Sequence, residues 1–137
     1  MPKNYTYQMQ DLFRFYKFAR QEIAEQRAEY EMECENAYKL GYRPKYCIHG
    51  TYMWCDYDVI CGHCEAALTD LEWAFANAKR RHIRYMEMYK HLDEIIRVRN
   101  NPANSYSVRE HLNDAIHQAF TEIQEYFAKY TGKVMEV

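Results

Sequence analysis

The sequence predicts an all-α protein: an elongated three-helix bundle of up-down-up topology, with a zinc-stapled loop between the first and second helices. Three observations lead to this fold class. Apolar residues recur at three- and four-residue steps through three long segments, which is the period of an amphipathic helix. Glycine and proline are scarce, with four and three copies in 137 residues, and cysteines cluster between the first two segments. With 48% hydrophobic and 28% charged residues, residues 1–137 are expected to form a single domain.

The first helix is expected over about residues 7–40. Its apolar stripe runs from Met9 to Ala37. Gly41 ends the stripe, and Pro44 prevents its continuation because proline lacks the N–H that a helical hydrogen bond needs. At 1.5 Å per residue this helix would be roughly 50 Å long.

Two further helices are expected, over about residues 62–100 and 107–131. The second ends at Asn100-Asn101-Pro102, and the third opens with capping-box spacing at Ser107 and Glu110 and closes at Gly132. Short connections make sequential helices antiparallel neighbours. The third helix, about 35 Å long, covers only part of the hairpin. It should lie beside the first helix where five residues place apolar side chains on more than one face: Leu12, Phe13, Phe15, Tyr16 and Phe18.

The loop over about residues 41–62 carries four residues with the spacing of a zinc site. Cys47 and His49 are two residues apart, so in an extended segment their side chains point to the same side. Cys61 and Cys64 form a C-x-x-C knuckle, in which Gly62 can take backbone angles closed to other residues. Because this knuckle starts a helix, the helix dipole favours both thiolates. We predict a closed structural zinc site.

Cysteine usage leaves the ligand set open at one position. Four of the five cysteines fall within 18 residues, which in a reducing compartment favours metal over disulfide. Cys55 is an alternative ligand in place of His49, and His63 is a weaker substitute.

The segment from Cys47 to Tyr52, followed by Cys61 to Glu65, resembles a C-x-H-G-x-Y…C-G-x-C-E segment in small uncharacterised proteins encoded by bacteriophages. The resemblance covers about 20 residues. It implies a phage origin and the use of Cys47, His49, Cys61 and Cys64 as ligands, and it implies no activity. The chain departs from it at Met53-Trp54-Cys55, where those proteins tend to carry glycines.

The sequence argues against catalysis. A catalytic zinc keeps one position open for water, whereas four protein ligands close the shell. The H-x-E that deaminases carry upstream of their knuckle is absent, and so is H-E-x-x-H. Asp114 and His117 have carboxylate-histidine spacing, but we interpret them as a solvent-facing helix surface. A metal-dependent hydrolase, with water beside Glu65 or Asp58, is the third reading.

A basic stretch in the second helix allows two interpretations. It consists of Lys79, Arg80, Arg81 and Arg84. If Lys39 and Cys64 both lie near the zinc end, antiparallel counting places Glu22, Glu25 and Glu29 opposite this stretch, and ion pairs then fix the helix pairing. The alternative is a nucleic-acid-binding surface, used together with the loop aromatics by an accessory protein.

The leading functional hypothesis is a non-enzymatic binding protein that engages a protein partner, such as a host or defence protein, through the zinc loop or a helix face. Aromatic and basic side chains of the kind that anchor protein interfaces crowd this loop: Tyr42, Arg43, Lys45, Tyr46, Tyr52, Trp54 and Tyr57. No signal peptide or stretch of about 18 apolar residues is evident, so we expect a cytoplasmic protein, in the host cell if phage-encoded. Self-association is also expected, because the apolar N-terminal segment has more faces than one neighbour covers.

Overall fold

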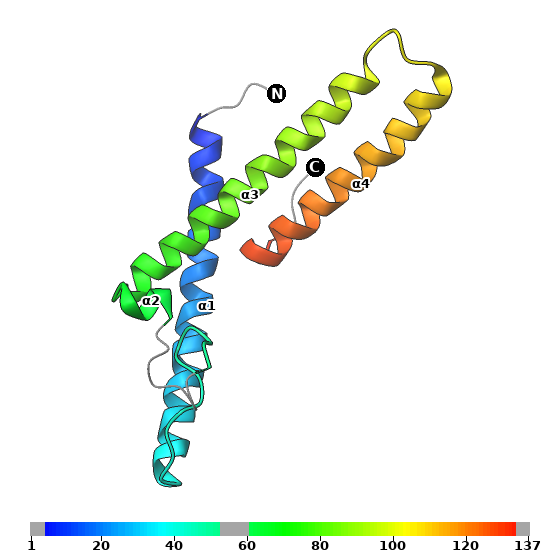
Figure 1. The fold of residues 1–137 in the computed structure, drawn as a ribbon. Helices are drawn as coiled ribbons and strands as arrows, with labels where there is room; N and C mark the ends of the chain where they lie inside the picture. The colour runs from blue at the N-terminus through cyan, green and yellow to red at the C-terminus, as the bar shows by residue number, and fades with distance from the viewer. Residues whose placement is uncertain (1–4, 53–60, 134–137) are drawn as a thin grey trace. The chain divides into compact units, whose positions relative to one another are not determined.

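A computed structural model describes residues 5–52 and 61–133 of the chain (Figure 1), with side chains from Met9 onward. Within these ranges lie four α-helices: α1 (Tyr5–Lys39), α2 (Gly62–Glu65), α3 (Asp70–Arg99) and α4 (Tyr106–Thr131). The described residues contain no strand, and Tyr46 and Tyr52 form an isolated antiparallel bridge. The all-α class and the three long helices are confirmed, whereas the up-down-up order of all three stays a prediction.

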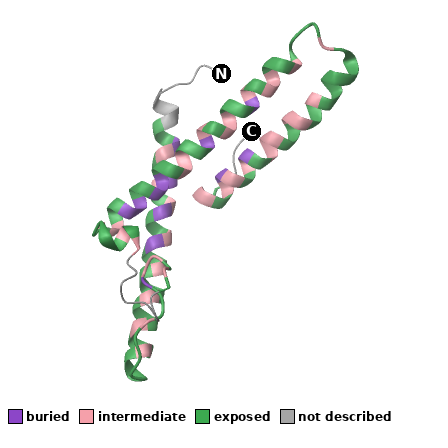
Figure 2. Cartoon of the chain, in the orientation of Figure 1, coloured by how far each residue is buried: buried purple, intermediate pink, exposed green. Residues whose placement is uncertain are grey.

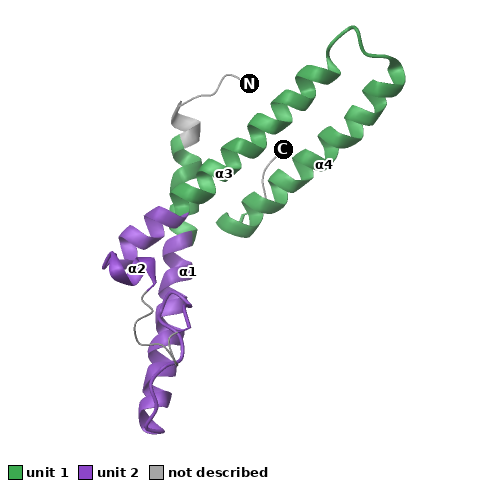
Figure 3. Cartoon of the chain, viewed as in Figure 1, with its two compact units in different colours: residues 1–18, 78–137 green, residues 19–77 purple. Residues whose placement is uncertain are grey.

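The chain divides into two compact units (Figure 3), one of residues 1–18 and 78–137 and the other of residues 19–77. We call them the hairpin unit and the metal unit. Helix α1 supplies residues to both units, and so does α3. The single domain over residues 1–137 stays a prediction.

Helix α1 ends as its sequence predicts. Gly41 takes a left-handed φ of 78°, which lets the backbone turn back at the helix end. The N–H of Tyr42 then donates to the carbonyl of Ala37 at 2.8 Å. Gly132, with φ 69°, ends α4 in the same way, and its N–H donates to the carbonyl of Ala128.

The predicted helix over residues 62–100 is interrupted, which corrects the sequence analysis. Helix α2 is a single turn, Ala67 takes a positive φ of 50°, and α3 begins at Asp70. Thr69 and Glu72 form a reciprocal cap at this new start. The Glu72 N–H donates to the Thr69 hydroxyl at 3.2 Å, and the Thr69 N–H donates to the Glu72 carboxylate at 3.4 Å.

The cap of α4 also differs from the predicted one. The structure caps α4 at Ser105, whose side chain accepts from the N–H of Val108. The predicted cap, Ser107, lies inside the helix. An N-cap serine must lie three residues before a backbone N–H that has no partner within the helix. Ser105 meets this requirement two residues before the predicted cap.

In the hairpin unit, α3 and α4 are antiparallel neighbours (Figure 1), as predicted. The Tyr126 hydroxyl near the end of α4 donates to the Arg81 carbonyl early in α3, at 3.4 Å. At the opposite end, the Arg99 guanidinium donates to the Asn113 side chain. The buried apolar residues of the hairpin unit form one core cluster: Phe15, Ala78, Tyr85, Leu92, Ile123 and Phe127. Figure 2 shows the buried stretches of the helices in purple.

The N-terminal part of α1 joins this core beside the end of α4, which confirms the predicted place of the last helix. The rings of Phe15 and Phe127 lie 5.9 Å apart, and Phe15 also packs against Tyr85. Phe15 is completely buried, whereas Phe13 is 65% exposed. Burial of one side of α1 and exposure of the other is the usual pattern for an amphipathic helix.

Candidate metal centre

A tight turn presents the first two candidate ligands. The N–H of Cys47 donates to the Thr51 carbonyl, and the N–H of Gly50 donates to the Cys47 carbonyl, both at 2.9 Å. Gly50 has a φ of 88°, which the turn requires and which glycine adopts without strain. Cys47 and His49 therefore converge through a turn, and the expected extended segment is wrong.

The second pair lies at the start of α2. Cys61 is the N-cap, and its Sγ accepts from the N–H of Cys64 at 3.2 Å. Gly62 has no positive φ and sits in the first turn, so the expected role for its backbone freedom is wrong. The glycine that needs such freedom is Gly50. Because α2 has four residues, its dipole is also much weaker than that of the long helix we expected.

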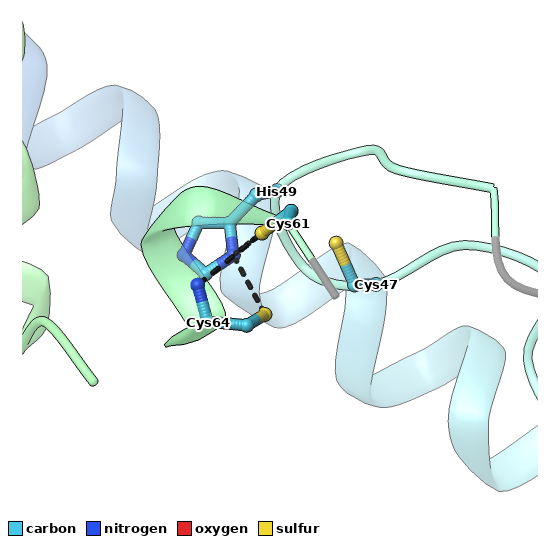
Figure 4. Close-up of side chains that lie close together, drawn as sticks. All are labelled: Cys47, His49, Cys61 and Cys64. Carbon is cyan, nitrogen blue, oxygen red and sulfur yellow. Dashed lines mark hydrogen bonds between the residues drawn. The ribbon is translucent and has the colours of Figure 1, made fainter. Parts of the chain in front are cut away.

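The two pairs meet at one point (Figure 4). One donor atom from each of Cys47, His49, Cys61 and Cys64 lies within 4.8 Å of the other three. The Nδ1 atom of His49 is 3.2 Å from the Sγ of Cys64 and 3.3 Å from the Sγ of Cys61. Tetrahedral zinc, with bonds of about 2.0 to 2.3 Å, separates its ligand atoms by roughly 3.3 to 3.8 Å. These residues form a site that could hold a metal ion, and three sulfurs with one imidazole are donors typical of zinc.

The electrostatics of the site suit a cation. Burial, helped by His63 and Arg27, lowers the pKa of His49 below its usual range, so the imidazole is neutral as a ligand must be. Burial and the neighbouring Cys61 side chain raise the pKa of Cys64 to about 12. For Cys61, burial raises the pKa, but hydrogen bonds from the Cys64 backbone and side chain outweigh it and lower the pKa overall. A bound cation would favour the thiolate forms of Cys61 and Cys64.

Helix α1 anchors the metal loop through residues that sequence analysis missed. The side-chain amide of Gln26 donates to the Ile48 carbonyl at 2.7 Å. Arg27 makes a two-pronged ion pair with Asp70 at the start of α3, with both N–O distances 2.5 Å. Tyr30, one turn further on, is half-buried, and this burial raises its pKa to about 12. The spacing of Gln26, Arg27 and Tyr30 along α1 was the signal in the sequence that could have pointed to these contacts. A polar residue on a helix does not by itself reveal which distant residue it contacts.

These anchors also correct the register that we expected between the first two long helices. Arg27, not Lys39, marks the place where α1 meets the start of α3. Arg27 lies 12 residues before the end of α1 at Lys39, which is about 18 Å at 1.5 Å per residue. In the hairpin unit, His82 in the middle of the basic stretch packs against Phe15. The pairing of Glu22, Glu25 and Glu29 with the basic stretch stays a prediction.

The basic stretch has identified neighbours within its own unit. The Arg81 guanidinium lies 4.3 Å from the centre of the Tyr130 ring of α4. Arg84 pairs with Glu87, one turn along α3, at 3.7 Å. Lys79 and Arg80 are exposed. Elsewhere in the hairpin unit, Asp114 and His117 are exposed, as the solvent-facing interpretation of that pair predicts.

Four of the seven predicted contact residues, Tyr42, Arg43, Lys45 and Tyr46, lie together in the metal unit. They line a groove of about 510 Å³ together with the end of α1; its lining is Glu33, Ala37, Leu40, Tyr42, Arg43, Pro44, Lys45 and Tyr46. Tyr52 is exposed and packs edge-on against Tyr46, with ring centres 5.3 Å apart. Trp54, Tyr57 and the alternative ligand Cys55 lie outside the described residues, as does Asp58.

Comparisons with known proteins return nothing: no protein-family model, no curated protein and no solved structure matches this chain. Among the described residues, no helix combines the length and the apolar character that crossing a membrane requires.

Proposed function

We propose that this chain is a non-enzymatic binding protein stabilised by one zinc ion, held by Cys47, His49, Cys61 and Cys64. The observation that carries the zinc assignment is the convergence of four donor atoms, from two chain segments 12 residues apart, within 4.8 Å of one another. Thiolates and imidazole together select zinc over magnesium or calcium, which prefer oxygen ligands. The reducing conditions of a cytoplasm would keep these thiols out of disulfides and available to the metal.

The donor set supports a structural role for the ion. Four protein donors complete a tetrahedral shell, so no position is left for a reactive water. The free energy of metal binding then becomes folding free energy, because the unfolded chain lacks the site. Zinc would tie the turn at Cys47 to the knuckle at Cys61 and hold both against α1.

Metal analysis tests this part of the proposal. We expect one zinc per chain in protein purified without chelator, and a lower melting temperature after chelation. Cys47→Ser should lose the ion, whereas Cys34→Ser, a half-buried cysteine outside the donor group, should keep it. Less than half an equivalent of zinc would contradict the proposal. Loss of zinc in Cys55→Ser but not in His49→Ala would assign the fourth position to Cys55.

The groove supports a protein partner as the ligand of this molecule. Tyr42 and Tyr46 are 60% and 51% exposed, and large exposed aromatic side chains are typical anchors of protein interfaces. The groove lining carries two basic residues, Arg43 and Lys45, and one carboxylate, Glu33. A protein segment that presents apolar side chains flanked by Asp or Glu complements this surface. The resemblance to phage-encoded proteins makes a host or defence protein a natural source of that segment.

A pull-down from bacterial lysate with matched variants tests the surface. We expect Tyr46→Ala to lose the captured protein, and Tyr106→Ala, a more exposed tyrosine of the hairpin unit, to retain it. Binding should change little between low and moderate salt if aromatic contacts dominate. Capture of DNA or RNA with a steep loss of affinity in salt, abolished by Arg80→Glu, would support the nucleic-acid alternative instead.

A further inference from the structure

His49 packs against two aromatic side chains that supply no donor atom to the site and whose ring centres lie 6.0 Å from each other. The imidazole of His63 is stacked on it, with ring centres 5.1 Å apart and planes inclined by 24°. The indole of Trp73 packs edge-on at 4.2 Å, inclined by 68°. Trp73 is buried in the first turn of α3, so its ring has a fixed place. His49 is therefore held by rings from α2 and α3.

This packing fixes the plane and the position of the ring, and one of its two nitrogens then faces the sulfurs. It is Nδ1 that lies 3.2 and 3.3 Å from the Sγ atoms of Cys64 and Cys61 (Figure 4). A histidine can bind a metal through either ring nitrogen, and the surroundings of the ring decide which one. A half-turn about the Cβ–Cγ bond would keep the plane of the ring but move Nδ1 away from both sulfurs. Binding through Nε2 would require the ring to shift against His63 and Trp73.

We propose that His49 binds the metal through Nδ1, and that His63 and Trp73 are positioning residues that hold the imidazole in this orientation. The inference rests on the proposed zinc site and adds the ligand atom and its support. His63 lies inside the C-x-x-C knuckle, so the same turn that places two sulfurs also places the stacked ring. Trp73 couples the site to α3, and the ion pair between Arg27 and Asp70 fixes the start of that helix against α1.

The ligand atom can be read directly by NMR. Protein labelled with ¹⁵N-histidine and loaded with zinc or cadmium gives long-range proton-nitrogen spectra that distinguish a metal-bound Nδ1 from a metal-bound Nε2. We expect a metal-bound Nδ1 and a protonated Nε2 for His49. A metal-bound Nε2 would overturn the inference while leaving the zinc proposal intact. A protein that binds no metal would instead refute the zinc proposal itself.

The positioning role is tested by zinc affinity, measured by competition with a chromophoric chelator. Removing a residue that orients a ligand typically weakens metal binding by about 10- to 100-fold. We expect that loss in Trp73→Ala and in His63→Ala, and substantial recovery in Trp73→Phe and His63→Phe, which keep a ring. Phe75→Ala, an exposed aromatic residue of the same helix, is the matched control and should bind zinc normally.

A second measurement separates positioning from folding. Circular dichroism of each variant without metal shows whether the helices persist, and His63→Ala is the milder change should Trp73→Ala fail to fold. Unchanged zinc affinity and an unchanged Nδ1 signature in His63→Ala, together with normal affinity in any folded Trp73→Ala, would refute the positioning role.

Discussion

Replacing Phe15 with alanine should strongly destabilise the protein. The side chain is completely buried and its ring lies 5.5 to 6.3 Å from four other aromatic rings, those of His82, Tyr85, Tyr126 and Phe127. Truncation removes the ring from this cluster and leaves a cavity, which costs about 3 to 5 kcal/mol for a buried phenylalanine. For 137 residues the unfolding entropy is about 0.29 kcal/mol per kelvin. The melting temperature should therefore fall by roughly 10 to 17 °C.

The same helix provides the control for this measurement. Phe13, two residues away, is 65% exposed, so Phe13→Ala should change stability by no more than about 0.5 kcal/mol. Urea titration followed by circular dichroism, with the slope compared between variants, gives both values. Equal losses in the two variants, or a loss below about 1 kcal/mol for Phe15→Ala, would refute the assignment of Phe15 to the core.

Three other changes have outcomes set by particular contacts. Burial, which outweighs the nearby Arg14, raises the pKa of Asp11 above its ordinary 3.8, so stability falls as pH rises from about 4 through the folded pKa. Asp11→Asn should thus be more stable than the parent at pH 7 in urea titration, and lower stability would contradict this. The hydrogen bond from Arg27 lowers the pKa of Asp70, so this pair contributes above pH 4 and is lost on acidification. Because both partners are partly exposed, a double-mutant cycle should give about 0.3 to 1 kcal/mol, and no coupling at neutral pH would refute the pair. Arg81→Glu should cost about 0.5 to 2 kcal/mol through loss of the contact with Tyr130, and restoration by Glu25→Lys would support glutamate pairing instead.

Local signals in the sequence predicted the helix ends well where glycine was involved. Gly41 and Gly132 both take the left-handed conformation at the ends of α1 and α4. The interruption near Ala67 was missed because a positive φ at alanine has no sequence signature. Thr69 and Glu72 carried the spacing of a capping box, but an apolar stripe that continued through them favoured one uninterrupted helix.

The metal site was likewise predicted in part from the sequence. The types and spacing of Cys47, His49, Cys61 and Cys64 were enough to predict a common site, because few arrangements of cysteine and histidine serve another purpose at that spacing. Which backbone shape brings them together was predicted incorrectly at Gly62. The observed turn at Gly50 and N-cap at Cys61 place the four ligands at the same sequence spacing as the extended segment and glycine-dependent knuckle that we expected. Ligand spacing alone therefore does not distinguish the two backbone shapes.

The sequence by itself determined the all-α class, the three long helices and the four convergent donors, because these depend on residue type and on spacing within a short segment. Only the tertiary structure decided where the site docks on α1, which nitrogen of His49 faces the sulfurs, and which ring supports it. Those features depend on side chains far apart in the sequence, such as Arg27 and Asp70. Helical periodicity fixes the face on which a residue lies, but it leaves the sliding of one helix along another undetermined, and that sliding is set by long-range contacts.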